Sequence, residues 1–287
     1  RAVRGSSSPI SAGRLAECGI DPKRSVFWFY PYNPHIPKLI RHFQPKLKVA
    51  DLVDAHRTWP DLSEIKRLHL TLHYREVLKT ADLALANCET VRDALGKYHP
   101  DIRLVPNGCE VTPPPEAPAD EAFQRFTALG GPKLVYVGNL EKGKIDTDLI
   151  RHMAGNRPDW QICLIGSTHA NPDIMELDAL ANVHFFGVVP YPEVRAWISA
   201  CDAAILPHVD SVKTRSMNPL KLYVYCSLGV PVVATDIRNL DALRSHIAVA
   251  PSYDAFIAAV DDALENGKQG IAGDLRECLA ENSWPRR

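Results

Sequence analysis

Apolar positions in the second half of the chain form short β-branched runs, and segments with helical spacing lie between these runs. The runs predict buried strands, because the strands of a parallel sheet are covered on both faces. The predicted strands are 133–137, 161–165, 183–186, 203–206, 232–235 and 247–249. The predicted helices lie near 146–155, 192–200, 218–228 and 252–266. This alternation predicts an α/β fold, in which a parallel sheet carries helices on both faces and the crossovers are right-handed.

The first part of the chain shows the same alternation over fewer elements. Strands are predicted at 25–30, 48–53, 82–86 and 102–105, and helices near 34–44, 62–79 and 89–98. Thr112–Ala119 contains four prolines in eight residues, which predicts a stiff linker rather than a helix or a central strand. We therefore expect an N-terminal domain at 1–112, a Pro-rich linker at 113–131 and a C-terminal domain at 132–287.

Composition is that of a soluble globular protein, with 46% hydrophobic and 23% charged residues in a chain of 287. No run approaches the ~20 apolar residues of a membrane span, and the N-terminus lacks the apolar core of a signal peptide. The sequence begins without Met, so we expect a fragment or a processed product. The seven cysteines include no CxxC pair, which argues against zinc and redox sites and indicates free thiols in the cytoplasm.

Charge is unevenly divided along the chain. Residues 1–112 contain 17 Lys and Arg against 12 Asp and Glu, whereas the remainder contains 16 against 22. A basic first domain favours an anionic acceptor or peripheral contact with lipid headgroups at the inner membrane face. Ordinary variation in composition is the alternative explanation. No basic cluster with interleaved aromatic residues predicts nucleic-acid binding.

The helix predicted near 218–228 is the most informative segment of the chain. Asn218 suits the N-cap and Pro219 the first helical position, while Gly229 suits the left-handed residue after the helix. A helix N-terminus attracts phosphate through its unpaired N–H groups and its dipole, and Lys221 adds a positive charge. The segment could hold a diphosphate without a metal, or it could be an ordinary helix–strand unit.

This segment resembles the donor-binding signature of GT-B glycosyltransferases, which use nucleotide-sugar donors. The matching residues are Pro219, Lys221, Tyr223, Tyr225, Gly229, Pro231, Val232, Val233, Ala234 and Thr235. Similar runs occur at 81–90, 105–111, 158–166 and 182–187. The chain is most similar to group 1, family 4-like enzymes of bacterial cell-surface polysaccharide synthesis. The resemblance implies two Rossmann-like domains around a cleft. Relatives usually have another strand–helix unit or two at the start, so we expect the first domain to be incomplete.

The resemblance implies a donor site in the second domain. Gly138 begins a loop in which Lys142 or Lys144 could meet a phosphate, while Asp146 is expected to cap the next helix. Relatives often hold the nucleobase through backbone groups of the loop that contains Val189. The implied donor-binding residues are Gly138, Asn139, Lys144, Val189, Thr214, Asn218, Pro219, Leu220, Lys221 and Val224. We expect no metal or other cofactor, because fixed dipoles and cations can neutralise the leaving group.

Val224 departs from the family pattern. It occupies the position of a glutamate that usually accepts a hydrogen bond from the donor ribose, and Ser216 occupies the position of another glutamate found in many retaining members. The missing charged hydrogen bond is worth roughly 1.5–3 kcal/mol, or about ten- to a hundredfold in affinity. A non-catalytic nucleotide- or glycan-binding relative therefore remains an alternative to an enzyme. A GT-B epimerase shares the fold but needs acidic cleft residues that the sequence does not reveal.

A polar turn follows the strand predicted at 48–53. Asp54 matches the first aspartate of a Val-Asp-Asp motif that relatives often have, and His56 lies two positions later. As predicted catalytic residues, either could be the general base of an inverting enzyme, or both could orient the acceptor of a retaining one. Helix capping by Asp54 is the alternative.

The predicted activity is transfer of a sugar from a nucleotide-diphosphate donor to a glycan, lipid-linked or small-molecule acceptor. The donor base, the sugar, the acceptor, the stereochemical outcome and the oligomeric state are not determined by the sequence.

Overall fold

The computed structural model describes residues 12–56, 59, 62–268, 271 and 273–287. The chain forms two compact units, Arg1–Pro106 and Asn107–Arg287. This division lies a few residues before the expected boundary at 112. Cys109 belongs to the second unit because it is hydrogen-bonded to the C-terminal segment of the chain. Its N–H donates to Asn282 O at 3.1 Å, and its carbonyl accepts from Trp284 N at 3.1 Å.

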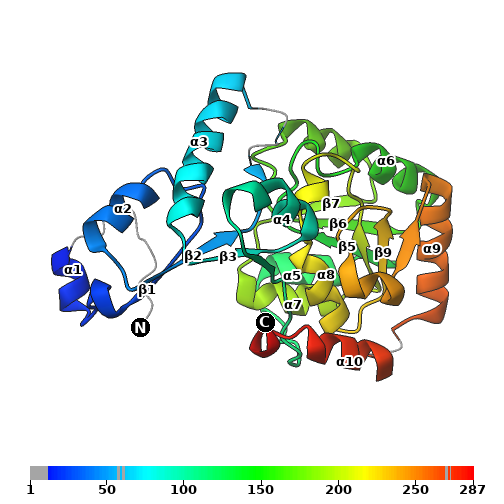
Figure 1. The fold of residues 1–287 in the computed structure, drawn as a ribbon. Coiled ribbons are helices and arrows are strands. Elements are labelled where there is room, and N and C mark those ends of the chain that lie inside the picture. Colours follow the sequence, from blue (N-terminus) through cyan, green and yellow to red (C-terminus); the bar gives the residue numbers. More distant parts are fainter. Residues whose placement is uncertain (1–11, 57–58, 60–61, 269–270, 272) are drawn as a thin grey trace. The chain divides into compact units, whose positions relative to one another are not determined.

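The first unit is a four-stranded parallel sheet with one layer of helices (Figure 1). Its strands are β1 (Val26–Phe29), β2 (Leu47–Leu52), β3 (Leu83–Ala86) and β4 (Ile102–Leu104). Its helices are α1 (Ala12–Glu17), α2 (Ile36–Phe43), α3 (Glu64–Thr80) and α4 (Glu89–Leu95). The strands are ordered as in the sequence, so right-handed crossovers place the connecting helices α2, α3 and α4 on the same face.

The core of the first unit lies between this helix layer and one face of the sheet. Phe29 and Leu52 from the strands pack with Tyr74 of α3 in one buried cluster. Residues of the opposite face point away from that cluster. Val26 and Trp28 of β1 lie on this face and are 57% and 55% exposed.

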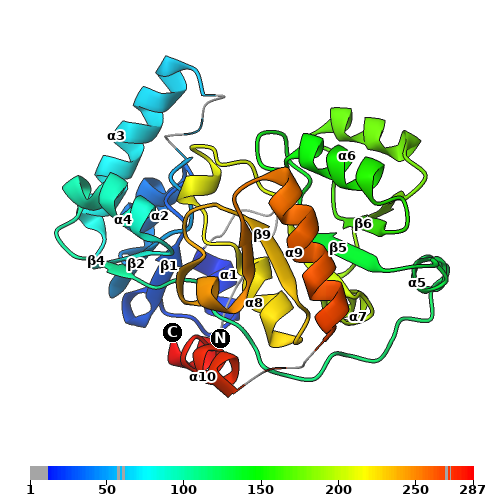
Figure 2. The same ribbon diagram turned by 90° about the vertical axis from the view of Figure 1, so that its right-hand side faces the viewer.

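The second unit is a six-stranded parallel sheet with helices on both faces (Figures 1 and 2). Its strands are β5 (Lys133–Val137), β6 (Gln161–Ile165), β7 (Val183–Gly187), β8 (Ala203–Leu206), β9 (Val232–Thr235) and β10 (Ala248–Ala250). Its helices are α5 (Glu121–Thr127), α6 (Thr147–Asn156), α7 (Tyr191–Ser199), α8 (Leu220–Ser227), α9 (Tyr253–Asn266) and α10 (Gly273–Glu281). Short 3-10 helices cover Pro22–Arg24, Gly96–Tyr98, Pro172–Ala179, Thr214–Ser216, Asp241–His246 and Trp284–Arg286.

The strand order β10-β9-β8-β5-β6-β7 places a topological switch point between β5 and β8. From β5 the chain continues outward through β6 and β7, and then returns to the other side of β5 through β8. Connections on the two sides of such a point leave in opposite directions, so a crevice opens beyond the carboxyl ends of the two strands. The loops after β5 and β8 are therefore the first place to look for a ligand site.

The strands and most helices predicted from the sequence are present, but the predicted linker also contains a helix. Asp120 accepts a hydrogen bond from Phe123 N at 3.0 Å and so caps α5. Phe123 and Phe126 of this helix then pack against the ring of Trp197 in α7. The aromatic residues, rather than the prolines, determine the structure of this part of the segment.

No helix in the described part of the chain is long and apolar enough to cross a membrane. The seven cysteines are free thiols, as predicted. Cys163, Cys201 and Cys226 are buried in the core of the second unit.

Candidate active site

Three neighbouring strands of the second unit end in glycines that adopt positive φ angles. Gly138 (φ 136°), Gly166 (φ 146°) and Gly187 (φ 67°) follow one another at the carboxyl ends of β5, β6 and β7. Gly166 N donates to Gly187 O at 2.7 Å, and a Cβ atom on Gly166 would lie only 2.0 Å from Gly138 O. Only glycine fits there, so this edge of the sheet presents bare backbone to which a ligand can approach closely.

The loops on the two sides of the switch point are joined to each other. Asp146 N donates to Pro207 O at 2.8 Å, and Val209 N donates to Lys144 O at 2.9 Å. Asp146 also caps α6 by accepting from Leu149 N at 2.9 Å, as predicted. These bonds fix the backbone around Lys144 against the end of β8.

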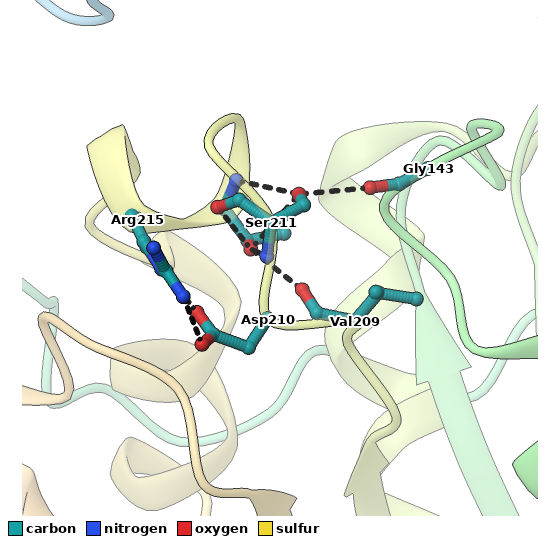
Figure 3. Close-up of polar contacts among 6 residues, drawn as sticks. Gly143, Val209, Asp210, Ser211 and Arg215 are labelled. Atoms are coloured by element: carbon teal, nitrogen blue, oxygen red, sulfur yellow. Dashed lines mark hydrogen bonds and ion pairs between the residues drawn. The ribbon is translucent and has the colours of Figure 1, made fainter.

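The loop after β8 is held by its own side chains (Figure 3). Thr214 Oγ1 donates to Val209 O at 2.6 Å, and Ser211 Oγ donates to Gly143 O in the neighbouring loop at 3.0 Å. Arg215 donates two hydrogen bonds to the carboxylate of Asp210, at 2.8 and 2.7 Å. Thr214 is buried, so the hydroxyl of this predicted donor-binding residue serves the shape of the loop.

The prediction that Asn218 caps α8 is wrong. The helix begins at Leu220, and Pro219 occupies the N-cap position. The Asn218 side chain is instead engaged with other loops: Oδ1 accepts from Asn107 N at 2.7 Å, and Nδ2 donates to Asp241 Oδ2 at 2.5 Å. No side chain in the described structure caps α8, and in its first turn Leu222 N donates to Pro219 O at 3.0 Å. The N–H groups of Leu220 and Lys221 precede this bond and face the end of the helix to which an anion is attracted.

Two lysines belong to the region around the loop that begins at Gly138, which we call the glycine loop (residues 138–146). Nζ of Lys221 lies 5.0 Å from the centroid of the Tyr136 ring, and a Cβ atom on Gly138 would lie 3.2 Å from the same nitrogen. Lys144 is buried in the loop that follows Gly138, and Val209 N donates to its main-chain oxygen. Burial, followed by the neighbouring Lys144, holds the pKa of Lys221 well below its ordinary value. Of the two lysines that the sequence left open, Lys142 is exposed and pairs with Asp173 at 2.7 Å.

A buried histidine completes this cluster. His208 Nε2 lies 3.2 Å from Tyr136 Oη, and the ring is only 2% exposed. Burial lowers the pKa of His208 well below its ordinary value, and the charges of Lys221 and Lys144 lower it further. His208 is therefore neutral at physiological pH and supports the Tyr136 ring beneath Lys221.

The other predicted donor-binding residues surround this cluster in different ways. Val224 is partly buried on α8 and packs against the core, as does Val189 after β7. Asn139 and Leu220 are exposed, at the loop after β5 and at the first turn of α8. Tyr225, which follows Val224 on α8, has a structural role. Its Oη accepts from Val137 N at 2.8 Å and so joins α8 to the end of β5.

The predicted catalytic residues belong to the first unit. Asp54 and His56 follow β2, at the carboxyl edge of its sheet. His56 stacks on Tyr32 with ring centroids 4.3 Å apart, and its Nδ1 lies 3.0 Å from Tyr74 Oη. To act as a base through Nε2, His56 would have to donate its Nδ1 proton to Tyr74. Burial, Asp54 and Tyr32 raise the pKa of Tyr74, which keeps its hydroxyl protonated.

Sequence reasoning missed two groups, one in each unit. Asn87 follows β3, is 7% exposed, and its Oδ1 has no hydrogen-bond partner among the described residues. Tyr136 lies inside a predicted strand, and no sequence pattern indicates that its hydroxyl contacts His208. In both cases the position of the residue relative to the neighbouring strands reveals its role, and this position is known only once the strands are placed in their sheet.

Among the described residues, no three His, Cys, Asp or Glu side chains are grouped so that they could hold a metal ion.

Comparison with known proteins shows what this arrangement is similar to. Residues 131–266 match the family described as Glycosyl transferases group 1. A relative in Bacillus subtilis (strain 168), the glycosyltransferase TuaH assigned to teichuronic acid biosynthesis, is 26% identical over 94% of this chain and 71% of its own length.

Solved structures share the fold at lower sequence identity. Sucrose-phosphate synthase from Thermosynechococcus elongatus has a TM-score of 0.70 and 17% identity, covering 95% of this chain and 72% of its own. Anabaena HepE in complex with UDP-glucose has a TM-score of 0.63 and 17% identity, covering 84% of this chain and 68% of its own. The second unit therefore matches the group 1 glycosyltransferases over residues 131–266, and the chain shares the fold of these solved glycosyltransferase structures.

Proposed function

We propose that the chain transfers a sugar from a nucleotide-diphosphate donor, and that the donor diphosphate binds between the glycine loop and α8. The observation that carries this proposal is that Lys144 and Lys221 follow β5 and β8, the neighbouring strands at the switch point, and that Lys221 lies in the uncapped first turn of α8 with its Nζ close to Gly138. Two ammonium-bearing side chains and a helix N-terminus are the groups that a diphosphate requires. The structure of HepE with UDP-glucose, on a similar fold, supports this class of donor.

In the transfer step the bond between the anomeric carbon and the β-phosphate oxygen breaks, and the acceptor oxygen forms the new bond. Negative charge develops on the departing nucleoside diphosphate. Lys144, Lys221 and the α8 dipole would stabilise this charge, because they are fixed before the reaction begins. We propose that these groups make a metal ion unnecessary.

Val224 determines how firmly the nucleoside is held. A valine leaves the donor ribose without the carboxylate that relatives use, so we propose a weaker nucleotide contact rather than an absent one. The family match and the TuaH relative favour an enzyme over the non-catalytic binding protein that Val224 also allowed. Teichuronic acid synthesis by TuaH supports a glycan acceptor.

Asp54 and His56 are proposed to serve the acceptor. Asp54 lies close enough to Tyr74 to raise its pKa, and the Tyr74 hydroxyl contacts His56. This linked trio can accept or orient an acceptor hydroxyl. Asn87 offers a buried carbonyl oxygen at the end of the adjacent strand β3 and is a further candidate for contact with the acceptor.

We propose that the first unit also contacts the inner membrane face. Helix α3 exposes Ile65, Leu68 and Leu72 at 70%, 58% and 52%. Their spacing places them on one side of the helix, and exposed Lys66 and Arg75 lie on the same helix. An apolar stripe with basic neighbours suits an anionic lipid surface. This supports a cytoplasmic protein with peripheral membrane attachment.

The donor site is tested by thermal unfolding in the presence of UDP, GDP, ADP or CDP. A ligand at a hundred times its dissociation constant should add about 2.7 kcal/mol to the free energy of unfolding. We expect one nucleotide to raise the melting temperature, and Val224→Glu to raise it further with that nucleotide. Lys221→Met should abolish the shift, whereas Lys142→Met should retain it. If none of the four nucleotides shifts either the native chain or Val224→Glu, the donor site is wrong.

A further inference from the structure

The carboxyl edge of the first unit carries a row of aromatic rings that remains partly exposed. Tyr32 stacks on His56 with ring centroids 4.3 Å apart and 27° between the ring planes, and the centroid of the Trp59 ring lies 4.7 Å from that of His56. Tyr32 follows β1 and His56 follows β2, which are neighbouring parallel strands. Because Tyr32 is 49% exposed, its ring offers apolar surface to a ligand at the end of this row.

Consecutive residues of α3 hold both members of the stacked pair. Nε2 of His73 donates a hydrogen bond to Pro31 O at 2.6 Å, and Pro31 directly precedes Tyr32 in the chain. The hydroxyl oxygen of Tyr74 lies 3.0 Å from Nδ1 of His56. A half-exposed ring that is anchored in this way loses little conformational freedom when a ligand stacks on it. The pair is therefore a preorganised surface for binding.

Two hydrogen-bond acceptors lie at the same edge of the sheet. Asn87 follows β3, and its N–H donates to Leu52 O, at the end of β2, at 3.3 Å. Its side chain is buried, and Oδ1 has no hydrogen-bond partner among the described residues. A buried oxygen without a partner is costly, which points to a ligand or water that donates to it. The second acceptor is the carboxylate of Asp54, which, after burial, is the next cause of the raised pKa of Tyr74.

An aromatic ring beside two oxygen acceptors suits a neutral sugar. A pyranose has an apolar face of C–H groups that packs on an aromatic ring, and hydroxyl groups around its rim that donate hydrogen bonds. A phosphate or an acidic sugar would instead bring a second negative charge to Asp54.

We propose that Tyr32 and His56 form a subsite for a neutral pyranose of the acceptor, which stacks on Tyr32 while its hydroxyl groups donate to Asp54 and Asn87. The proposal rests on the proposed function, in which Asp54 and His56 serve the acceptor. It narrows the acceptor to a glycan or glycoside whose reacting end is an uncharged sugar.

NMR titration of the native chain with simple glycosides tests the subsite, with and without the nucleotide identified by the melting-temperature screen. The neutral probes are the methyl β-glycosides of glucose, galactose and N-acetylglucosamine, and methyl β-glucuronide is their acidic counterpart. We expect saturation transfer to the C–H protons of at least one neutral probe, together with NOEs between these protons and the Tyr32 ring. The dissociation constant of the glucuronide should be at least about tenfold higher, and Asp54→Asn should remove most of this difference.

The outcomes separate the subsite from the proposed function. Clear nucleotide binding without contact between any neutral probe and Tyr32 would overturn the subsite. A glucuronide that binds as tightly as the neutral probes would overturn the assignment to an uncharged sugar. Contact with a neutral probe in a chain that binds none of the four nucleotides would support the subsite and overturn the proposed function instead.

Three variants assign the stacking to Tyr32. Tyr32→Ala should raise the dissociation constant of the bound glycoside about three- to tenfold, the effect of one aromatic contact. Tyr32→Phe retains the ring and should bind like the native chain. Trp28→Ala removes another exposed aromatic residue, on the open face of β1, and is the matched control that should leave the affinity unchanged. Native affinity in a folded Tyr32→Ala variant would refute the role of this ring. If that variant does not fold, the NOEs of the native chain decide alone.

Discussion

Asn107 and Asn218 are joined by two hydrogen bonds across 111 positions of sequence. Asn107 N donates to Asn218 Oδ1, and Asn107 Nδ2 donates to the Asn218 main-chain oxygen, each at 2.7 Å. The first bond takes the side-chain oxygen that would otherwise cap α8. Asn218 therefore positions the start of α8 through Asn107, at the beginning of the second unit, and does not cap the helix.

Asn218→Ala should lower the free energy of unfolding by about 1–3 kcal/mol, because it removes the acceptor of Asn107 N and leaves the Asp241 carboxylate without this donor. It should also weaken binding of the nucleotide found in the melting-temperature screen, since the turn before Leu220 loses its anchor. Urea unfolding and the nucleotide titration check both effects. Asn107→Ala, which removes only one side-chain bond, is the matched control and should cost less. Equal stability of the two variants would contradict this role.

Gly166→Ala should strongly destabilise the second unit. The substitution places a Cβ atom 2.0 Å from Gly138 O and a side chain at φ 146°. Backbone strain of about 1–3 kcal/mol and overpacking of about 1–3 kcal/mol should add. Gly155→Ala is the matched control, because Gly155 lies in α6 and its Cβ would meet nothing within 4 Å. That variant should gain about 0.5–1 kcal/mol. Chemical denaturation of both proteins decides the comparison, and similar stabilities would disprove the close approach of the two strand ends.

His208 should make the protein lose stability as the pH falls. Its pKa is lowered in the folded state, so below about pH 6.5 the unfolded chain binds a proton that the native protein does not. The free energy of unfolding should then fall by up to about 1.4 kcal/mol per pH unit until the folded pKa is reached. His208→Gln retains a polar partner for Tyr136. In urea titrations at several pH values, this variant should show a smaller fall of the unfolding free energy at acid pH, the acid limb of the stability curve. His42→Gln, a change at an exposed histidine, should leave the limb as it is. An unaltered limb in His208→Gln would show that other groups cause the loss.

The limits of sequence reasoning are visible at α8. Local rules placed the helix and its closing glycine correctly, since Gly229 has φ 66°. They failed at Asn218, because the partner that takes its side chain lies 111 positions away. The lysine cluster was out of reach for a similar reason. Lys144 follows β5 and Lys221 follows β8, and the two meet only because these strands are neighbours at the switch point. Periodicity predicts strands but not their order. In the segment 113–131, four prolines concealed a short helix whose cap and aromatic residues were present in the sequence.

The core cysteines should resist alkylation in the native protein. Burial raises the pKa of Cys163 and of Cys226 to about 12, so at a pH of about 8 only about one thiol in ten thousand is a thiolate. Iodoacetamide followed by peptide mass spectrometry should label partly exposed Cys18 first, and should label Cys163 and Cys226 only after urea is added. Labelling of the two core thiols at the rate of Cys18 without urea would show that the second unit opens readily.

The apolar stripe of α3 should determine membrane attachment if the first unit contacts lipid. Burial of one leucine side chain is worth roughly 1.5–3 kcal/mol, so Leu68→Glu should lower cosedimentation with phosphatidylglycerol vesicles at least tenfold. The added carboxylate would also be repelled by the anionic surface. Met175→Glu makes the same kind of change at a 41% exposed residue of the second unit and should leave binding unaltered. Vesicles of phosphatidylcholine alone should retain less of the native protein, because the basic residues of α3 then lack an anionic partner. Binding that is equally strong in Leu68→Glu and in the native chain would exclude this helix as the attachment surface.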